Sequence, residues 1–150
     1  MIRAARMSAV VIRNAEQRDA AAIASLVTEL GYPATADEVR QRLARLSACA
    51  DAEALVAEAT GKVVGVATGH VIPCLHSTPI VAKLTMLVVA ADSRQIGVGK
   101  QLCAGIERWA QDRGATKISV TSGQQRSGAH VFYERIGYER TGVRLTKVFT

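Results

Sequence analysis

Cysteine, proline and aromatic residues are all scarce in this sequence. Its 150 residues include 3 Cys, 3 Pro and only 4% aromatic residues. The cysteines, Cys49, Cys74 and Cys103, are odd in number, far apart and form no CxxC pair. We therefore expect neither a disulfide framework nor a metal site. This cysteine usage fits a reducing cytoplasm best.

Long hydrophobic runs are also missing. No apolar run reaches the roughly 18 residues that a membrane span needs, and residues 1–8 lack the apolar centre of a signal peptide. We expect a soluble protein with no membrane partner, in which residues 1–8 form a flexible extension and Met7 is an alternative start. With 49% hydrophobic and 21% charged residues, the composition predicts a single globular domain over residues 1–150.

Positive charge is concentrated in the last third of the chain. Residues 1–93 hold 9 Lys/Arg and 9 Asp/Glu, whereas residues 94–150 hold 10 and 4, so the net charge of +6 arises there. Such a bias indicates an anionic partner. Because stacking aromatics are few and no Lys/Arg run exceeds two residues, we expect no nucleic-acid partner. A phosphate-bearing small molecule and a merely basic surface remain open.

Hydrophobic periodicity predicts alternating strands and helices in an α/β (mixed α+β) layered domain with a central mixed sheet. Asp19 is a candidate cap for the first helix, and Thr35 with Glu38 forms a capping-box pattern at the second. Strands are predicted at residues 10–12, 54–59, 63–71, 80–89, 117–121 and 145–149, helices at 19–30, 35–46, 98–113 and 128–136, and a loop at 72–79.

The segment with the clearest chemical meaning is Ser93–Lys100, between a predicted buried strand and an amphipathic helix. Gly97 and Gly99 allow a tight turn and a close approach of the backbone to a ligand. The first turn of a helix presents unpaired N–H groups and the positive end of the helix dipole. With Arg94 and Lys100 at its rim, the segment is typical of a phosphate-binding loop.

Two widespread phosphate motifs do not match this segment. A P-loop requires GxxxxGK[ST], but Lys100 is followed by Gln101 and a single residue separates the glycines. A dinucleotide fingerprint requires a third glycine where this chain has Leu102. A phosphate cradle of another type and a glycine-rich turn without a ligand therefore remain as alternatives.

The segment resembles the first motif of the GNAT superfamily of acetyl-CoA-dependent N-acetyltransferases, [RQ]-x-x-G-x-[GA] after a strand. Arg94, Gly97 and Gly99 match it in register, and Leu87–Val89 matches the apolar-x-Val that precedes it. This resemblance implies a mostly antiparallel sheet that is splayed at the cofactor cleft and flanked by about four helices.

A second family feature lies about 30 residues downstream. Ala129, the pair Phe132-Tyr133 and the pair Gly137-Tyr138 reproduce the spacing of an alanine on a short helix, an aromatic-Tyr pair and a Gly-aromatic pair. The chain departs from the family at Arg126, where an asparagine is common. Two motifs in the family's order indicate membership of the family far more specifically than either motif alone.

The resemblance implies that acetyl-CoA is the acyl donor and that no metal takes part. The backbone of the strand before the loop would pair with the pantetheine amides and stabilise the oxyanion, and the loop would hold the pyrophosphate. The residues implied in cofactor binding are Leu87, Val88, Val89, Arg94, Gln95, Ile96, Gly97, Val98, Gly99, Lys100 and Arg126.

Tyr133 occupies the family position of the acid that protonates the leaving thiolate, and Tyr138 is expected to pack. The strand from Lys83 to Val89 carries no carboxylate, so Glu29, His70, His76 and an ordered water remain alternatives for the base.

The implied reaction is direct attack of a primary amine, on a small molecule or a peptide, through a tetrahedral intermediate. Specificity in this fold usually depends on segments that here lie near residues 25–46 and 70–80, and the acceptor itself cannot be read from them. The alternative is a non-catalytic acyl-CoA-binding or regulatory domain of the same fold. The resemblance also allows a homodimer, which no feature of the sequence fixes.

Overall fold

The centre of the molecule is a five-stranded sheet with the strand order β1-β2-β3-β4-β5. The structure is a computed structural model that describes residues 9–94, 96–122 and 127–150. Neighbouring strands are antiparallel except for β4 and β5, which are parallel. This arrangement confirms the predicted mixed, mostly antiparallel sheet. The strands are β1 (Val11–Asn14), β2 (Ala52–Ala59), β3 (Lys62–Cys74), β4 (Ser77–Val89) and β5 (Ala115–Val120).

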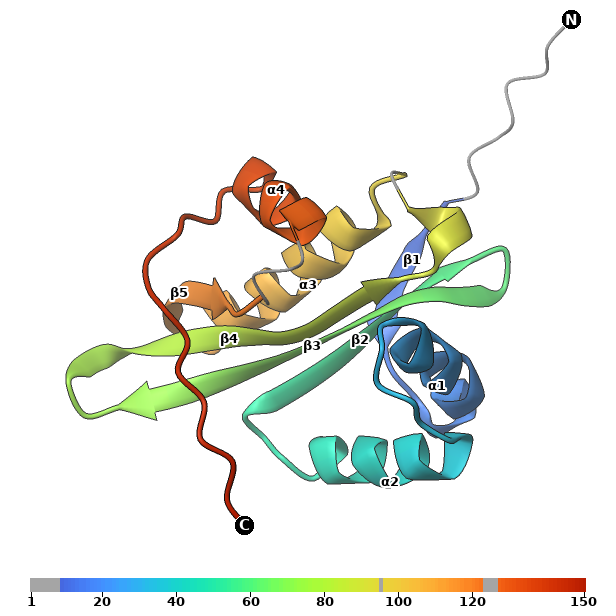
Figure 1. The fold of residues 1–150 in the computed structure, drawn as a ribbon, viewed down its shortest axis with the longest axis horizontal. Helices are drawn as coiled ribbons and strands as arrows, with labels where there is room; N and C mark the ends of the chain where they lie inside the picture. The colour runs from blue at the N-terminus through green and yellow to red at the C-terminus, as the bar shows by residue number, and fades with distance from the viewer. Residues whose placement is uncertain (1–8, 95, 123–126) are drawn as a thin grey trace, which may run out of the picture.

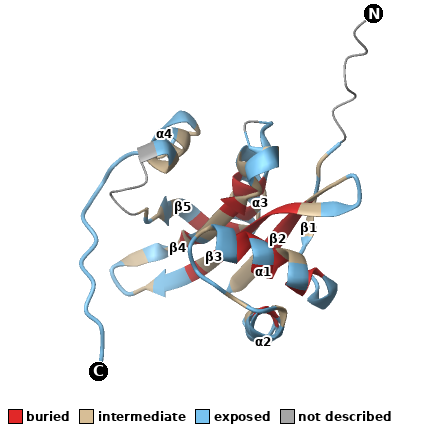
Figure 2. Cartoon of the chain, turned by 45° about the vertical axis from the view of Figure 1, so that its right-hand side comes forward, coloured by how far each residue is buried: buried red, intermediate tan, exposed pale blue. Residues whose placement is uncertain are grey.

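Helices cover both faces of this sheet (Figure 1). Val56 of β2 packs with α1 and α2 on one face, whereas its neighbours Leu55 and Ala57 pack with α3 on the other. The alternation of strand side chains thus divides the core into two layers, which Figure 2 shows as buried segments on either side of the sheet. The helices are α1 (Ala20–Glu29), α2 (Ala36–Ser47), α3 (Val98–Asp112) and α4 (Ser127–Arg135), with 3-10 turns η1 (Gln17–Asp19) and η2 (Ala91–Ser93).

The helix signals of the sequence are confirmed except at Asp19. Thr35 and Glu38 form the capping box of α2. Asp19 stands at the N-cap position of α1 but makes no capping hydrogen bond. Its carboxylate, only 4% exposed, instead accepts hydrogen bonds from Arg13 at 2.8 and 2.9 Å and from the Glu16 N–H at 2.8 Å. The predicted cap was wrong because a strand arginine offers a stronger, charge-assisted partner.

The expected loop at residues 72–79 is instead the end of a long hairpin. β3 continues to Cys74 and β4 begins at Ser77, where these two residues pair. The pairing is irregular between Ile72 and Cys74. Pro73 and Pro79 fall within this irregular stretch, where no ladder hydrogen bond requires their missing N–H. The two prolines suggested a loop, but they only distort the hairpin.

The strand predicted at residues 145–149 is absent from the structure. No helix or strand is assigned from residue 136 to 150, and every residue from 139 to 150 is exposed. A strand requires a neighbour, and after α4 this segment lies apart from the sheet (Figure 2). The β-type sequence pattern at 145–149 therefore pairs with no strand among the described residues.

Residues 1–8, predicted to be a flexible extension, lie outside the described residues. In the described part of the chain, no helix combines the length and the apolar character needed to cross a membrane. There, too, no group of three His, Cys, Asp or Glu residues is arranged to hold a metal ion.

Candidate active site between β4, β5 and α3

The sheet opens between β4 and β5. β5 pairs with β4 only as far as the pair Leu84–Val120, whereas β3 pairs with β4 up to Val89. Within the described residues, positions 85–89 therefore have a strand neighbour on the β3 side only. Apart from the Val89 carbonyl, which accepts a hydrogen bond from Arg94, backbone groups of this stretch that point away from β3 face no described strand and can bind a ligand. The predicted site residues Leu87, Val88 and Val89 all lie in it.

A β-bulge marks the point where the sheet opens. Thr68 of β3 pairs with Met86 and Gly69 pairs with Leu84, so Thr85 is the extra residue of β4. The Thr85 hydroxyl lies 2.7 Å from the Thr68 hydroxyl and 3.4 Å from His70 Nδ1. This cluster of Thr68, His70 and Thr85 was not identified from the sequence, although its polar residues alternate along β3.

The loop after β4 leads directly into the N-terminus of α3. Gly97 is the N-cap, with a φ of 85°, a left-handed conformation that favours glycine. Because glycine has no side chain with which to cap the helix, the first-turn N–H groups and the positive end of the dipole face the loop. A Cβ at this position would have no atom within 4 Å. The backbone geometry, not packing, therefore requires glycine here.

Gly99 is constrained by packing instead. A Cβ there would lie 3.2 Å from Phe132 Cζ, tighter than an ordinary contact. The ring of Phe132 thus packs directly on the first turn of α3 and positions α4 beside the loop. The absence of a side chain at Gly99 therefore lets α4 pack closely on the first turn of α3, a role that the sequence did not predict.

Arg94 bridges three parts of the site. Its Nε donates to the Val89 carbonyl at 3.2 Å, and its Nη2 lies 3.6 Å from Glu29 Oε1 at the end of α1. Glu29 also accepts from the Ala91 N–H at 3.2 Å. The Arg94 side chain remains 56% exposed, so its guanidinium keeps donors for a ligand.

The other predicted loop residues differ in exposure. Ile96 is 45% exposed and Lys100 is exposed, whereas the Val98 side chain is 1% exposed and belongs to the core. Val98 can therefore offer only its backbone. Gln95 and Arg126 lie outside the described residues.

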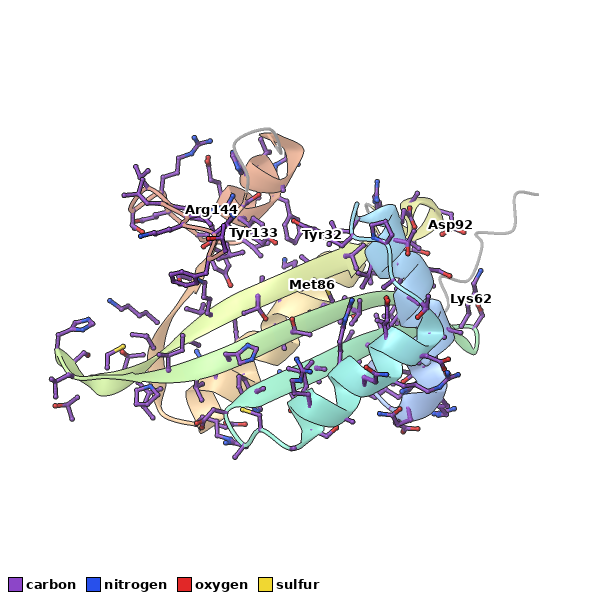
Figure 3. All side chains as sticks on the ribbon, turned by 60° about the horizontal axis from the view of Figure 1, so that its bottom comes forward. Tyr32, Lys62, Met86, Asp92, Tyr133 and Arg144 are labelled. Atoms are coloured by element: carbon purple, nitrogen blue, oxygen red, sulfur yellow. The ribbon has the colours of Figure 1, made fainter. Side chains whose placement is uncertain are left out.

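Tyr133 lies on α4, between this helix and the sheet (Figure 3). It packs against the cluster that contains Leu84, Val98 and Leu102. Its ring makes edge-on contacts with Phe132 and Tyr138, with ring centroids 5.2 and 5.6 Å away. The predicted acid therefore lies on the α3 side of the sheet, in the same cluster as Leu87 and Val89 of β4.

Tyr138 has the packing role that the sequence predicted. Its hydroxyl donates to Glu107 Oε2 on α3 at 3.1 Å, and its N–H donates to the Tyr133 carbonyl at 3.0 Å. Burial, reinforced by the Glu107 charge, raises the pKa of the Tyr138 hydroxyl. Burial likewise raises the pKa of the Cys103 thiol to about 12, which makes that thiol unreactive.

The three candidates for the base occupy different places. Glu29 is engaged by Arg94 and the Ala91 N–H beside the loop. His76 lies in the turn that joins β3 and β4. His70 is held by Thr85 at the bulge, where β4 and β5 separate. Of the three, His70 is the one that contacts Thr85, the first residue of the open stretch of β4.

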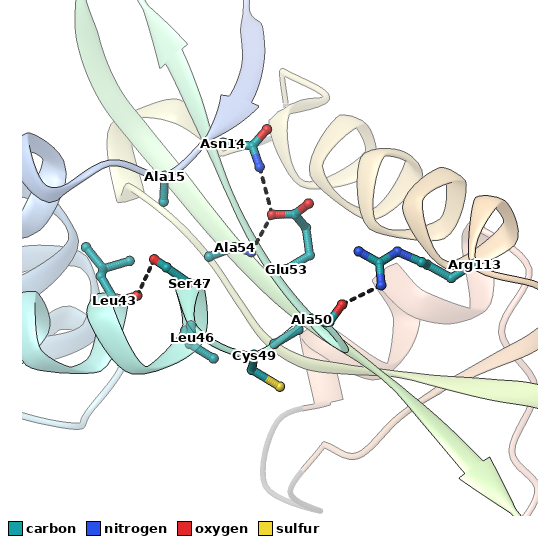
Figure 4. Close-up of a pocket in the computed structure, with 11 residues that line it drawn as sticks. Asn14, Ala15, Leu43, Leu46, Ser47, Cys49, Ala50, Glu53, Ala54 and Arg113 are labelled. Carbon is teal, nitrogen blue, oxygen red and sulfur yellow. Dashed lines mark hydrogen bonds between the residues drawn. The ribbon is translucent and has the colours of Figure 1, made fainter.

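A separate pocket of about 320 Å³ lies at the opposite end of α3, between α2 and β2 (Figure 4). Its polar groups bind one another. Asn14 donates to Glu53 at 2.9 Å, Ser47 donates to the Leu43 carbonyl at 2.7 Å, and Arg113 donates to the Ala50 carbonyl. None of the predicted site residues lines it, so it is not part of this site.

The chain matches the family model described as Acetyltransferase (GNAT) family over residues 19–138. It is 34% identical over 87 residues to the aminoalkylphosphonate N-acetyltransferase of Salmonella typhimurium (strain LT2). That match covers 58% of this chain and 56% of the relative. The chain thus spans little more than half of the length of that curated relative.

Solved structures reproduce the fold over almost the whole chain. A transcriptional regulator from Bacillus halodurans C-125 superposes with a TM-score of 0.84 at 22% identity, covering 94% of this chain and 100% of that one. The aminoglycoside N-acetyltransferase AAC(6')-Iy, in complex with CoA, gives a TM-score of 0.84 at 21% identity and covers 97% of both chains. At these identities the likeness establishes the fold.

Proposed function

The chain belongs to the acetyltransferase (GNAT) family, and on that basis we propose that it transfers an acetyl group from acetyl-CoA to a primary amine. One observation carries this proposal. Three features lie at one opening of the sheet: residues 85–89 of β4, which pair with β3 but not with β5, the left-handed Gly97 at the start of α3, and Tyr133 on α4. For acyl transfer from a phosphorylated thioester, the strand backbone would stabilise the oxyanion, the helix N-terminus would bind phosphate, and the phenol would protonate the leaving thiolate.

The loop suits the pyrophosphate of coenzyme A. The N-terminus of α3 supplies N–H donors and a positive dipole end, and the exposed Arg94 and Lys100 supply charge. The backbone of Leu87, Val88 and Val89 would pair with the pantetheine amides. Ile96 and Val98 would contribute only backbone and apolar contact. The roles of Gln95 and Arg126 remain those that the family resemblance implies.

The coenzyme A loop is tested by Gly97→Ala. A Cβ there meets no neighbour, yet the residue would resist the left-handed conformation that orients the first turn of α3. We expect coenzyme A affinity measured by calorimetry to fall about tenfold, or about 1.4 kcal/mol. Gly31→Ala, another left-handed glycine with open space around it, is the matched control. An equal loss of affinity in both variants would contradict the proposed role.

In the proposed mechanism, acetyl-CoA supplies the activated thioester. A backbone N–H of residues 87–89 donates to the thioester oxygen as negative charge develops there. The neutral amine attacks the carbonyl carbon, and Tyr133 donates its hydroxyl proton to the departing thiolate. The acceptor nitrogen must lose a proton in the same cycle.

His70 is the side chain best situated to receive that proton, directly or through a water. Its hydrogen bond to Thr85 fixes the ring at the bulge, one residue beyond the last β4–β5 pair. Histidine exchanges protons near neutral pH, as a general base must. Lys83 is the residue opposite His70 in the β3–β4 pair.

The proposed acceptor is a small-molecule amine. The curated relative and one of the similar structures are named for aminoalkylphosphonates and aminoglycosides, which are small amines. In this chain, the sheet surface around Thr68, His70 and Lys83 would receive the acceptor. The three unpaired cysteines support a reducing cytoplasm as the site of action.

The activity is tested by thiol release from acetyl-CoA in the presence of a panel of amines. We expect turnover with at least one small amine, and about 10²–10⁴-fold lower turnover in Tyr133→Phe, which removes only the hydroxyl. Tyr138→Phe, whose hydroxyl binds Glu107, is the matched control and should keep most of the activity. Coenzyme A binding without turnover on any amine would favour the non-catalytic alternative.

The base is tested separately by pH–rate profiles of wild type, His70→Gln and His76→Gln. We expect His70→Gln to lower kcat about 10²-fold near neutral pH and to recover as the pH approaches the pKa of the free amine. His76→Gln should match wild type. If all three profiles coincide, the assignment to His70 is wrong and the proton passes to Glu29 or to water.

A further inference from the structure

Part of the sheet surface on the side of α1 and α2 is not covered by these helices. The β3–β4 hairpin extends beyond both of them (Figure 1). Val66 and Val88 are buried in one cluster with α1. Nearer the hairpin turn, His70 and Lys83 are only half-buried and Thr85 is exposed. The uncovered part of the sheet therefore begins at the bulge, where β5 separates from β4.

Strand alternation brings polar side chains together on this surface. Gly69 and Leu84 face α3, because a Cβ at Gly69 would meet Ile106 and Leu84 packs in the same cluster as that helix. On β5, Ile118 and Val120 also pack on the α3 side. The residues next to them therefore face the other way. We call this surface the basic face, and its polar residues are Thr68, His70, Lys83, Thr85, Lys117 and Ser119.

The basic face receives no negative charge from the strands around it. β3, β4 and β5 contain no Asp or Glu. On neighbouring β2, Glu53 lies opposite Gly69, on the α3 side, and accepts a hydrogen bond from Asn14. The other acidic residue of β2, Glu58, is paired with Arg13. Among the described strands, none therefore supplies a counter-ion to this face.

Lys83 and Lys117 are neighbours on the basic face. Lys83 pairs with Ser119 of β5, two residues from Lys117. The two lysines therefore occupy diagonal positions on adjacent strands. Neither makes an ion pair or a hydrogen bond with any described residue. Because like charges repel unless an anion lies between them, this placement favours a ligand with negative charge.

The donors of this face suit a phosphate-type group better than a carboxylate. The planar fork of arginine matches a carboxylate, and β3, β4 and β5 contain no arginine. Lysine ammonium groups bind phosphate as point charges. Two of them match the double charge of a phosphate or phosphonate, and the exposed Ser119 beside Lys83 adds a hydroxyl donor.

These lysines lie close to the proposed reactive centre. Lys83 precedes Thr85 by two residues, or about 6–7 Å along a strand. The Thr85 hydroxyl lies 3.4 Å from Nδ1 of His70, the proposed base. An amine at His70 and an anionic group at the lysines can therefore belong to one molecule, joined by a short carbon chain.

We propose, on the basis of the acetyl transfer proposed above, that the acceptor is a short primary amine that carries a phosphate or phosphonate group, which Lys83 and Lys117 bind. The bound group directs the amine toward the open stretch of β4. There the bond from the amine nitrogen to the acetyl carbon forms and the carbon–sulfur bond of the thioester breaks, while the anionic group takes no part in the chemistry. The same lysines repel amines that carry further positive charge.

The first test compares acceptors by thiol release from acetyl-CoA. The panel is aminoethylphosphonate, phosphoethanolamine, β-alanine, propylamine and the diamine cadaverine. We expect kcat/KM for aminoethylphosphonate or phosphoethanolamine to exceed that for propylamine at least about tenfold, mainly through a lower KM. The better of the two shows whether the anionic group is a phosphonate or a phosphate. Equal values across the panel, or a preference for β-alanine or cadaverine, would overturn the proposal and leave the acetyl transfer intact.

Substitutions then assign the preference to the two lysines. Lys83→Gln and Lys117→Gln should each lower the ratio of kcat/KM for the preferred anionic amine to that for propylamine about tenfold. Lys83→Arg keeps the charge and should retain the preference. Lys62→Gln, at the other end of β3, removes the charge of an exposed lysine and is the matched control. A ratio that survives both glutamine substitutions at 83 and 117 would contradict the proposed role of the lysines.

Binding of ethylphosphonate, which has no amine, separates the anion site from the reaction. Calorimetry is done with coenzyme A present, so that the loop at the start of α3 is already occupied. We expect wild type and Lys62→Gln to bind ethylphosphonate, and Lys83→Gln to bind it at least about tenfold more weakly. If ethylphosphonate binds in this way but no amine is acetylated, the proposed function is wrong and the anion site stands. If wild type does not bind ethylphosphonate, or Lys83→Gln binds it equally well, the anion site is wrong.

Discussion

Arg13 and Arg94 differ in how far their guanidinium groups are buried and paired with carboxylates. Arg13 lies between Asp19 and Glu58, with three nitrogen–oxygen distances of 2.8–2.9 Å, and its side chain is 20% exposed. Arg94 lies 3.6 Å from Glu29, with 56 and 40% of the two side chains exposed. The first site uses its cation to join β1, β2 and the start of α1. The second leaves its cation available, as an anion-binding loop requires.

The energetic difference follows from burial. A buried carboxylate that loses its partner carries the full cost of its desolvation, whereas an exposed ion pair contributes little. Substitutions at Arg13 and Asp19 should therefore change folding and leave coenzyme A binding alone. Substitutions at Arg94 and Glu29 should do the reverse, and four measurements test this division.

The largest effect is expected from Asp19→Asn. The amide keeps the shape of the side chain but loses the charge-assisted bonds to Arg13, so the free energy of unfolding should fall by about 3 kcal/mol. Urea denaturation measures this change. Asp37→Asn, which disrupts an exposed pair with Arg40, is the control and should cost less than about 1 kcal/mol. Similar losses in the two variants would contradict the comparison.

The same carboxylate should make the fold sensitive to acid. The hydrogen bonds from Arg13 lower the pKa of Asp19 in the folded state, against the opposing effect of burial. Its stabilising contribution is therefore complete above the unfolded pKa of about 3.9 and is lost as the pH falls through the lower folded value. Denaturation between about pH 5 and 2 should show a steeper loss in wild type than in Asp19→Asn. Parallel curves would assign the acid sensitivity to other groups.

Arg94→Gln should affect binding instead of folding. Coenzyme A affinity should fall about tenfold, or about 1.4 kcal/mol, because a charge-assisted contact to phosphate is lost. The free energy of unfolding should stay within about 0.5 kcal/mol of wild type. Arg108→Gln, an exposed arginine on α3 outside the loop, is the matched control for net charge. An equal loss of affinity in both variants would mean that Arg94 acts only through the net charge of the protein and not through a direct contact with phosphate.

The smallest effect is expected from Glu29→Gln. Removing this carboxylate frees the Arg94 guanidinium and takes a negative charge away from the loop, so coenzyme A affinity should rise by up to about threefold at low salt. Calorimetry at two salt concentrations measures it. A fall in affinity would show instead that Glu29 is needed to orient Arg94 for binding.

Each of the two motifs that predicted the site is a short stretch of sequence. The contacts that hold the site together join residues that are far apart in the sequence. Gly97 was predicted from its place before a helix, and its left-handed conformation confirms that reading. The packing of Gly99 on Phe132 joins residues 33 positions apart, and the Arg94–Glu29 pair joins α1 to the loop after β4. No periodicity or spacing in the sequence encodes such pairs.

Features that depend on neighbouring residues can be predicted from the sequence, whereas contacts between distant segments cannot. The sequence by itself determined the alternation of elements, the capping box at Thr35, the turn at Gly97 and the family motifs, because each depends on neighbouring residues or a short repeat. Only the tertiary structure decided that Asp19 pairs with Arg13, that Thr85 bulges beside His70, and that β5 separates from β4 after Val120. It also decided that residues 145–149, which have the sequence pattern of a strand, pair with none of the described strands. A strand exists only where a second backbone meets it, and that meeting depends on the fold of the whole chain.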